Sequence, residues 1–160
     1  MIRKIIATDN YHGTTLLRLV VGVIFFAHGA QLMLGWFGGF GFHASMQVFT
    51  GMLHIPAVFA VVAICAEFFG GLALILGFLT RLAAIGIAVD MVVAIIMVHR
   101  QYGFFMNWYG TQKGEGYEYH LLVIAICIYL LIEGAGAISV DRMISNGAPG
   151  LVEVRSSSVR

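Results

Sequence analysis

Four stretches of the chain, at residues 14–34, 57–79, 82–99 and 119–138, are long and apolar enough to cross a lipid bilayer. A membrane-spanning helix needs about 20 mostly apolar residues, so four of them with their connections use nearly all of the 160 residues. An apolar content of 60% with only 11% charged residues also places the chain in the membrane class. We therefore expect an all-α integral membrane protein, a four-helix bundle without a soluble catalytic domain.

The positions of lysine and arginine predict the orientation in the membrane. Only Thr80 and Arg81 separate the second stretch from the third, which predicts a tight antiparallel hairpin. Because cytoplasmic segments are enriched in Lys and Arg, both termini and this hairpin are expected to be cytoplasmic. The result is a cytoplasmic segment at 1–13, a membrane domain at 14–143 and a cytoplasmic tail at 144–160. The basic residues on that side are Arg3, Lys4, Arg81, Arg142, Arg155 and Arg160, against Arg100 and Lys113 on the other.

Several classes of function are disfavoured by the composition. A net charge of +1 without a block of basic residues gives no indication of nucleic-acid binding. Cys65 and Cys127 lie singly in apolar runs, and no CxxC pair is present, so we interpret both as packing residues. The polar residues 8–10 follow the first basic residues where a signal peptide would have its apolar core, so the first stretch is expected to remain uncleaved.

Ionisable residues inside the apolar stretches predict a polar centre, because such groups in a membrane face the bundle interior. At about 1.5 Å per residue, His28 lies roughly 12 Å below Trp36, and Glu67 lies at a similar depth in the second stretch. These depths predict a His28–Glu67 pair in the outer half of the membrane. In the inner half, the long side chain of Arg18 is predicted to form a structural ion pair with Asp90.

The His28–Glu67 pair has two interpretations that the sequence leaves open, a functional site and a buried hydrogen-bonded lock. A histidine and a glutamate that exchange a proton beside a pocket would suit a quinone, whose carbonyl groups take up protons on reduction. The corresponding candidate site for ligand and protons, with a polar route from the outer surface, consists of His28, Gln31, Glu67, His99 and Glu118.

Other ligands have weaker support in the sequence. His99 and His120 could meet across the outer ends of their stretches, but two histidines alone are a poor indication of haem. His99, Glu118 and His120 lack the helical i, i+3 or i, i+4 spacing of a metal site, so no metal is expected. We expect no covalently bound cofactor, and quinone is the candidate ligand.

Both outer connections combine glycines with large aromatic residues. Such aromatic residues are typical of the belt at the membrane surface, and they could also form a rim around the entrance for a flat lipophilic ligand. Small residues recur at helix-packing spacing, which packing within the bundle explains and which is also compatible with a homo-oligomer. The residues of the predicted outer rim are Trp36, Phe37, Phe104, Phe105 and Trp108.

The ordered motifs of the chain resemble those of the DoxX family of small bacterial membrane proteins. The resemblance covers about residues 14–143 and implies a four-span bundle with redox work linked to quinone. One departure is Leu32, because the family commonly has a lysine after the His-Gly-x-Gln motif. The matching motifs are Leu17-Arg18-Leu19, His28-Gly29-Ala30-Gln31, Glu67-Phe68-Phe69-Gly70-Gly71-Leu72, Gly77-Phe78-Leu79-Thr80-Arg81, His99 with Gly103-Phe104-Phe105, Glu118-Tyr119 and Ser139-Val140-Asp141.

Our first hypothesis is a multi-pass protein of the bacterial cytoplasmic membrane that serves as a membrane subunit of a redox system. It would bind quinone or a similar lipophilic carrier and act, at most, as a quinone-linked oxidoreductase subunit with a partner redox protein. The second hypothesis is a non-catalytic scaffold that anchors partner proteins. A small transporter or proton path is a third, with less support because four spans without inverted repeats form a thin gate.

Overall fold

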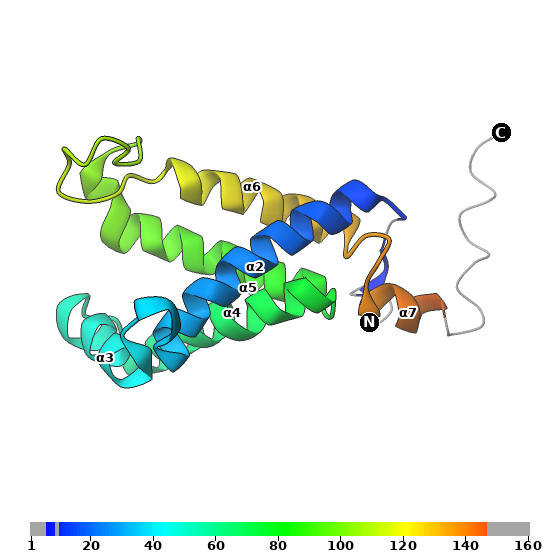
Figure 1. Cartoon of the computed structure of the whole chain (residues 1–160), viewed down its shortest axis with the longest axis horizontal. Coiled ribbons are helices and arrows are strands. Elements are labelled where there is room, and N and C mark those ends of the chain that lie inside the picture. Colours follow the sequence, from blue (N-terminus) through cyan, green and yellow to red (C-terminus); the bar gives the residue numbers. More distant parts are fainter. Residues whose placement is uncertain (1–5, 9, 147–160) are drawn as a thin grey trace.

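The computed structural model describes residues 6–8 and 10–146, and in this part of the chain the regular structure is entirely helical (Figure 1). Four long helices lie lengthwise beside one another and alternate in direction: α2 (His12–Leu34), α4 (Ala57–Leu76), α5 (Thr80–Ala94) and α6 (Glu118–Glu133). The shorter elements are η1 (Trp36–Gly38), α3 (Gly41–Gln47), η2 (Val48–Met52), η3 (Ile95–His99), η4 (Arg100–Tyr102) and α7 (Val140–Asn146).

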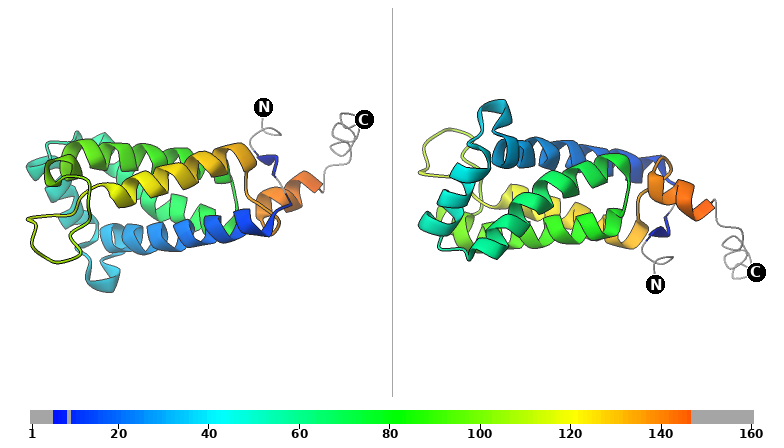
Figure 2. Two further views of the ribbon diagram at one scale, coloured as in Figure 1. Left: turned by 90° about the horizontal axis from the view of Figure 1, so that it is seen from above. Right: turned by 90° about the horizontal axis from the view of Figure 1, so that it is seen from below.

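The connections divide the molecule into two ends (Figures 1 and 2). At one end, called the terminal end, lie the start of α2, the turn between α4 and α5, and α7. At the other, called the loop end, lie α3 and the connection formed by residues 100–117. The predicted hairpin of the second and third apolar stretches is therefore present, and the two longer connections share the opposite end.

Residues with left-handed backbone end two of the long helices. Gly35 follows α2 with φ 72° and Gly77 follows α4 with φ 67°, a conformation in which glycine carries no steric cost. Leu79 also has a positive φ of 49° immediately before α5. Gly77 and Leu79 turn the chain so tightly that α4 and α5 pack side by side in opposite directions.

Glycines allow α2 and α4 to approach each other closely. A Cβ atom on Gly29 would lie 2.3 Å from the backbone nitrogen of Phe68, and one on Gly71 would lie 2.3 Å from that of Phe26. Gly22, two turns before Gly29 on the same face, would likewise come 2.8 Å from the nitrogen of Ile75. Helices in lipid associate through such small residues, since apolar burial between them gives little drive.

The fourth apolar stretch is helical over a shorter range than expected. The predicted span 119–138 corresponds to α6, which has 16 residues and ends at Glu133. Gly134 and Gly136 then adopt φ values of 87° and 82°, which no continuing helix permits. At 1.5 Å per residue α6 is about 24 Å long, somewhat less than the roughly 30 Å of a bilayer core.

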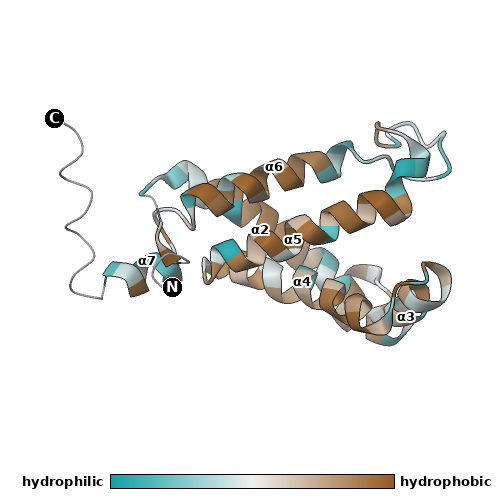
Figure 3. Ribbon diagram, turned by 180° about the vertical axis from the view of Figure 1, so that it is seen from behind, coloured by the Kyte–Doolittle hydropathy of each residue, from teal (hydrophilic) through white to brown (hydrophobic). Residues whose placement is uncertain are grey.

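Along most of their length the long helices consist of hydrophobic residues, while hydrophilic residues are more frequent toward the two ends (Figure 3). By length and composition, α2, α4 and the continuous helix from Thr80 to Tyr102 qualify as membrane spans. The chain is a membrane protein. An exposed apolar face on this scale is unfavourable in water and suits contact with lipid. Exposed residues on it include Val20, Val23, Val58, Phe59, Val62, Leu82, Ile85, Val89, Leu122, Ile128 and Ile132.

Part of the predicted orientation lies outside the described residues. Four of the basic residues that favour cytoplasmic termini, Arg3, Lys4, Arg155 and Arg160, fall there, as does most of the tail expected at 144–160. Arg81 and Arg142 are described, and both lie at the terminal end. This end therefore carries the basic residues of the hairpin and α7, whereas Arg100 lies at the loop end.

Candidate functional site

Glu67 of α4 and Asp90 of α5 are half-buried and meet between these two helices, where their side chains form a hydrogen bond to each other. A carboxylate can only accept hydrogen bonds, so this contact requires that one of the two carboxyl groups carries a proton. The hairpin explains the meeting. Glu67 lies ten residues before Gly77 and Asp90 lies ten residues after Thr80, so both are about 15 Å from the turn.

The predicted partner of Glu67 lies elsewhere. His28 is exposed on the outer surface of α2 and would face lipid. The physical reason is the close contact at Gly29, which directs this residue toward α4 and turns its neighbour His28 about 100° away around the helix. The predicted His28–Glu67 pair is thus replaced by the Glu67–Asp90 pair.

The predicted Arg18–Asp90 ion pair is likewise wrong. Arg18 is 1% exposed and lies at the terminal end, where its guanidinium donates hydrogen bonds to backbone carbonyl oxygens. The acceptors are Ile75 at 2.9 Å, Ala135 at 2.8 Å, Ile138 at 2.6 Å, and Leu74. Leu74 and Ile75 belong to the last turn of α4, where a helix leaves carbonyl groups unpaired and carries partial negative charge that a buried cation satisfies, whereas Ala135 and Ile138 lie in the segment after α6.

Asp141, rather than Asp90, is the acidic neighbour of Arg18. Asp141 is 1% exposed, and its carboxylate accepts hydrogen bonds from the backbone N–H groups of Leu79 at 2.8 Å and Thr80 at 3.0 Å. It therefore caps the N-terminus of α5 from a distant part of the sequence. Arg18 and Asp141 together hold α2, the α4–α5 turn and the segment after α6 at the terminal end.

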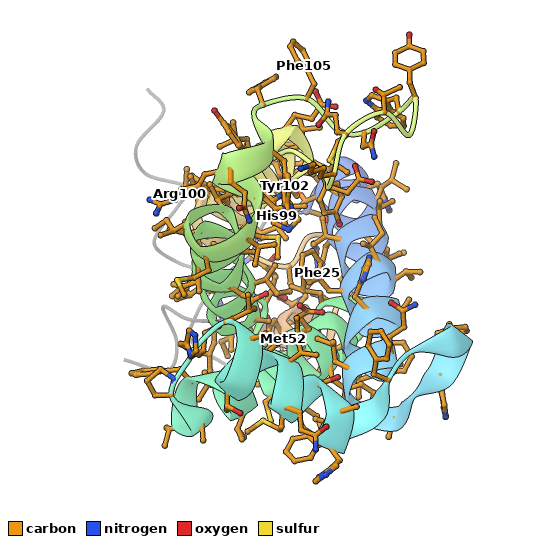
Figure 4. The ribbon with its side chains drawn as sticks, turned by 90° about the vertical axis from the view of Figure 1, so that its left-hand side faces the viewer. Phe25, Met52, His99, Arg100, Tyr102 and Phe105 are labelled. Carbon is orange, nitrogen blue, oxygen red and sulfur yellow. The ribbon has the colours of Figure 1, made fainter. Side chains whose placement is uncertain are left out.

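Two histidines meet at the loop end. The rings of His99, at the end of a π-helical turn after α5, and His120, in the first turn of α6, have centroids 4.0 Å apart. His99 Nδ1 lies 2.8 Å from the backbone oxygen of Glu115. Figure 4, which views this end, shows His99 turned toward the interior of the bundle and Arg100 directed outward. Within the described chain, no three His, Cys, Asp or Glu residues are grouped to hold a metal ion.

Tyr119 connects the loop end with the carboxyl pair. Its hydroxyl group is buried, and Glu67 lies close enough to act on it electrostatically. Its ring also contacts His120 edge to face, with centroids 5.6 Å apart. Tyr119 therefore stands between the outer histidines and the acidic pair in the interior.

A cavity of about 490 Å³ opens beside Tyr119 on the loop-end surface of α6. Glu118 supplies the carboxylate in its wall, and Glu118 Oε1 accepts hydrogen bonds from Trp108 Nε1 at 2.9 Å and from the Met106 nitrogen at 3.2 Å. Ligand sites are typically concave and apolar with a few such polar groups. The lining consists of Phe104, Met106, Trp108, Glu118, Tyr119, Leu121 and Leu122.

Of the remaining candidate residues, only part of the predicted aromatic rim reaches this cavity. Gln31 donates a hydrogen bond to the Phe37 carbonyl oxygen at 3.3 Å and so holds the turn after α2. The aromatic residues of the predicted rim form two groups, Trp36 with Phe37 and Phe104 with Phe105, each with rings edge to face. Only the group at residues 104–108 contributes to the cavity wall, through Phe104 and Trp108.

A family model described as DoxX matches residues 13–100 of the chain. These residues make up more than half of the sequence and include α4, α5 and almost all of α2. The chain belongs to the DoxX family. The resemblance noted in the sequence is thereby confirmed, and the match includes Glu67, Asp90 and His99 but ends before α6.

Two known proteins align with this DoxX protein over most of their length. "Putative oxidoreductase CatD" of Bacillus subtilis (strain 168) is 29% identical over 135 residues, which cover 84% of the present chain and 89% of CatD. "Inner membrane protein YqjF" of Escherichia coli (strain K12) is 26% identical over 133 residues, 83% of the chain and 92% of YqjF. No solved structure matches the chain significantly.

Sequence reasoning about this DoxX protein missed the partners rather than the polar positions. The sequence places both Glu67 and Asp90 inside the membrane, but it predicts for each a partner on α2, His28 and Arg18 respectively. Counting residues outward from the Thr80 turn would have placed the two carboxyl groups opposite each other. Tyr119 carried no comparable signal, because a tyrosine at the end of an apolar stretch is typical of the membrane interface.

Proposed function

We propose that this DoxX protein is the membrane subunit of a redox system and binds quinone or a similar lipophilic carrier. The observation that carries the proposal is the hydrogen bond between the half-buried carboxyl groups of Glu67 on α4 and Asp90 on α5. Burial opposes the charged form of each carboxyl group, and two such groups in contact cannot both ionise at low cost. The pair therefore holds one proton that it can give up and regain.

The carrier would need this proton chemistry. Reduction of a quinone to its quinol consumes two electrons and two protons, and oxidation of the quinol releases them. We propose that the electrons come from, or go to, a partner redox protein. The Glu67–Asp90 pair would supply or accept the protons one at a time, with Tyr119 between the pair and the cavity.

We also propose that α6 is the fourth span of a four-helix bundle in the bacterial inner membrane, with the terminal end in the cytoplasm. Exposed apolar residues of α6, including Leu122, Ile128 and Ile132, support its contact with lipid. The basic residues Arg81 and Arg142 at the terminal end support a cytoplasmic location for it. The printed name of YqjF, an inner membrane protein, agrees with this location.

The comparisons support redox work at a general level. The printed name of CatD is "Putative oxidoreductase CatD", and it aligns with 84% of the present chain. We extend that activity to this chain and add the carrier on the basis of the cavity beside Tyr119. An aromatic wall formed by Phe104 and Trp108 suits a flat ring, while Glu118 offers a carboxylate to a ring hydroxyl.

Binding of a soluble quinone analogue to the purified protein in lipid nanodiscs tests the proposal. We expect Glu67→Gln and Asp90→Asn each to weaken binding about tenfold, because loss of the shared proton removes one hydrogen bond from the series that leads from the pair through Tyr119 to the carrier. Glu115→Gln is the matched control, because Glu115 is exposed on the connection between α5 and α6. Unchanged affinity in both interior variants, together with lower thermal stability, would instead indicate a structural pair in a scaffold protein.

A further inference from the structure

Two buried polar atoms on successive residues of α6 have no hydrogen-bond partner within residues 6–8 and 10–146. They are the hydroxyl oxygen of Tyr119 and Nδ1 of His120. His120 is only 6% exposed, so bulk solvent does not reach its ring freely. A buried polar group without a protein partner is normally satisfied by ordered water, which typically makes about three hydrogen bonds.

The outer neighbour of His120 has a defined tautomer. His99 Nδ1 lies 2.8 Å from the carbonyl oxygen of Glu115. A carbonyl oxygen can only accept, so Nδ1 carries the hydrogen and Nε2 of the neutral ring keeps the lone pair. Glu115 itself is exposed, His99 is half-buried, and the His99 ring contacts that of His120 with centroids 4.0 Å apart. His99 thus connects the loop-end surface with the buried His120.

The inner neighbours continue the series toward the acidic pair. The edge-to-face contact between His120 and Tyr119 leads to a hydroxyl group within electrostatic reach of Glu67. Glu67 in turn is hydrogen-bonded to Asp90. The imidazole, phenol and carboxyl groups of this series can each donate or accept a hydrogen bond and take part in proton transfer. Of the other ionisable residues, Cys127 acts on Tyr119 electrostatically, Arg100 and Glu118 are sequence neighbours of His99 and Tyr119, and Glu115 accepts the His99 hydrogen bond through its backbone oxygen.

Among the described residues, no comparable series leads from the acidic pair toward the terminal end. Leu74 of α4, Ile87 of α5 and Leu130 of α6 are all 0% exposed and fill the interior on that side. They belong to one apolar cluster that also includes Val21 and Cys127. Close-packed apolar side chains of this kind leave no room for a file of water.

We propose that internal water bridges His120 Nδ1 and the Tyr119 hydroxyl group and completes a proton path from His99 to the Glu67–Asp90 pair. The path opens at the loop end alone. The biological role of this path rests on the proposed function, because the path carries the protons that the carrier takes up or releases. Reduction or oxidation of the carrier would then exchange its two protons with the outer side of the membrane, whereas its electrons pass to or from the partner protein.

Infrared spectroscopy of the protein in nanodiscs tests the path without any redox partner. After a change from H₂O to D₂O, the C=O stretch of the protonated carboxyl group reports how fast the shared proton exchanges, and its loss in Glu67→Gln identifies the band. We expect Tyr119→Phe and His120→Phe each to slow the exchange about tenfold, the factor that one lost hydrogen bond produces. His99→Gln, at a less buried position, gives a third variant of the same path.

Tyr129→Phe is the matched control. It removes a hydroxyl group from the same helix, but this group is paired with Thr14 Oγ1 at 2.8 Å and lies outside the path. Its exchange rate should stay within about twofold of the wild type, since a fully paired hydroxyl elsewhere does not carry the proton. Wild-type exchange in Tyr119→Phe, His120→Phe and His99→Gln together would overturn the path.

The same preparations separate the path from the proposed function. Quinone-analogue binding is measured beside the exchange rate, and the path predicts no requirement for His99 in binding. Slow exchange in the path variants without any quinone binding by the wild type would support the path and reject the carrier. Binding that depends on Glu67, with exchange indifferent to all three path variants, would support the carrier and reject the path.

Discussion

Gly29 lies against the backbone of Phe68 so closely that a Cβ atom on Gly29 would come within 2.3 Å of the Phe68 nitrogen. The neighbouring backbone belongs to a regular helix and cannot move aside without separating α2 from α4. Gly71 makes the reciprocal contact with Phe26. The position of α2 beside α4, and with it the outward direction of His28, therefore depends on glycines rather than on polar pairing.

Gly29→Ala should lower the free energy of unfolding in detergent by about 1–3 kcal/mol, the usual cost of overpacking. Gly13→Ala is the control on the same helix, because a Cβ atom there would meet nothing within 4 Å. Thermal unfolding followed by circular dichroism measures both. Equal melting temperatures for the two variants would show that α2 and α4 are not in close contact at Gly29.

Arg18 should be among the most sensitive positions for stability. Arg18→Met keeps much of the apolar stem but removes the donors to Leu74, Ile75, Ala135 and Ile138. Breaking a buried charged network of this kind costs about 3–5 kcal/mol, so we expect the variant to unfold or to express poorly. Arg18→Lys retains a cation with fewer, less directed donors, so its free energy of unfolding should lie between those of the wild type and Arg18→Met.

Arg100→Gln provides the comparison for Arg18, because Arg100 is exposed at the loop end. Its melting temperature should equal that of the wild type, since exposed charges contribute little to stability. A similar decrease in melting temperature in Arg100→Gln and Arg18→Met would mean that net charge, rather than hydrogen bonding to backbone carbonyl groups, accounts for the destabilisation of Arg18→Met.

A charge reversal tests whether Glu67 and Asp90 are partners. In Glu67→Lys, the new cation would face the carboxylate of Asp90 and form an ion pair across α4 and α5. In the Glu67→Lys, Asp90→Asn double variant the cation has no counter-charge, and we expect a further loss of about 3 kcal/mol. Thermal unfolding of the wild type, of Glu67→Lys, of Asp90→Asn and of the double variant together forms a double-mutant cycle that measures the coupling of the two residues.

The charge reversal has a distinct result if the predicted pairing with α2 were correct. The lysine introduced in Glu67→Lys would then lie beside His28, and removal of the Asp90 carboxylate would add no more than its own separate cost. Additive losses in the double variant would therefore contradict the Glu67–Asp90 pair.

The sequence was sufficient to predict the long helices of this membrane protein, because each contains an apolar run bounded by Gly, Pro or charged residues. The hairpin at Thr80 also followed from the short separation of two runs. By contrast, α6 ends at Glu133, since Gly134 and Gly136 take left-handed conformations that apolarity does not reveal. Apolar content thus predicts membrane segments better than it predicts where each helix stops.

Depth along a span could be estimated from the sequence, whereas rotation about the helix axis could not. The sequence predicts similar depths for His28 and Glu67, but the Gly29 contact fixes the rotation of α2 and directs His28 outward. The spacing of Gly22 and Gly29, seven residues apart, was the available signal for this face. Arg18 and Asp141 are 123 positions apart, and no local pattern could have shown that they meet at the same end.

The cavity beside Tyr119 can be located by fluorescence, because the chain has only two tryptophans. Trp108 belongs to the cavity wall, and Trp36 does not. Quinones quench tryptophan emission at short range. In Trp36→Phe, where Trp108 alone emits, a quinone analogue should therefore quench strongly and saturably. In Trp108→Phe the remaining emission from Trp36 should decrease only in proportion to free quencher.

Glu118→Gln refines this fluorescence experiment. The Trp108 Nε1–H group donates to Glu118 Oε1 at 2.9 Å, and an amide oxygen can accept the same hydrogen bond without charge. The emission of Trp108 should therefore stay close to that of the Trp36→Phe parent. The affinity for the analogue should fall about tenfold if the carboxylate accepts a ring hydroxyl, since bonds to charged groups are the stronger ones. Saturable quenching of Trp36 and not of Trp108 would place the ligand at the turn after α2 and reject the cavity.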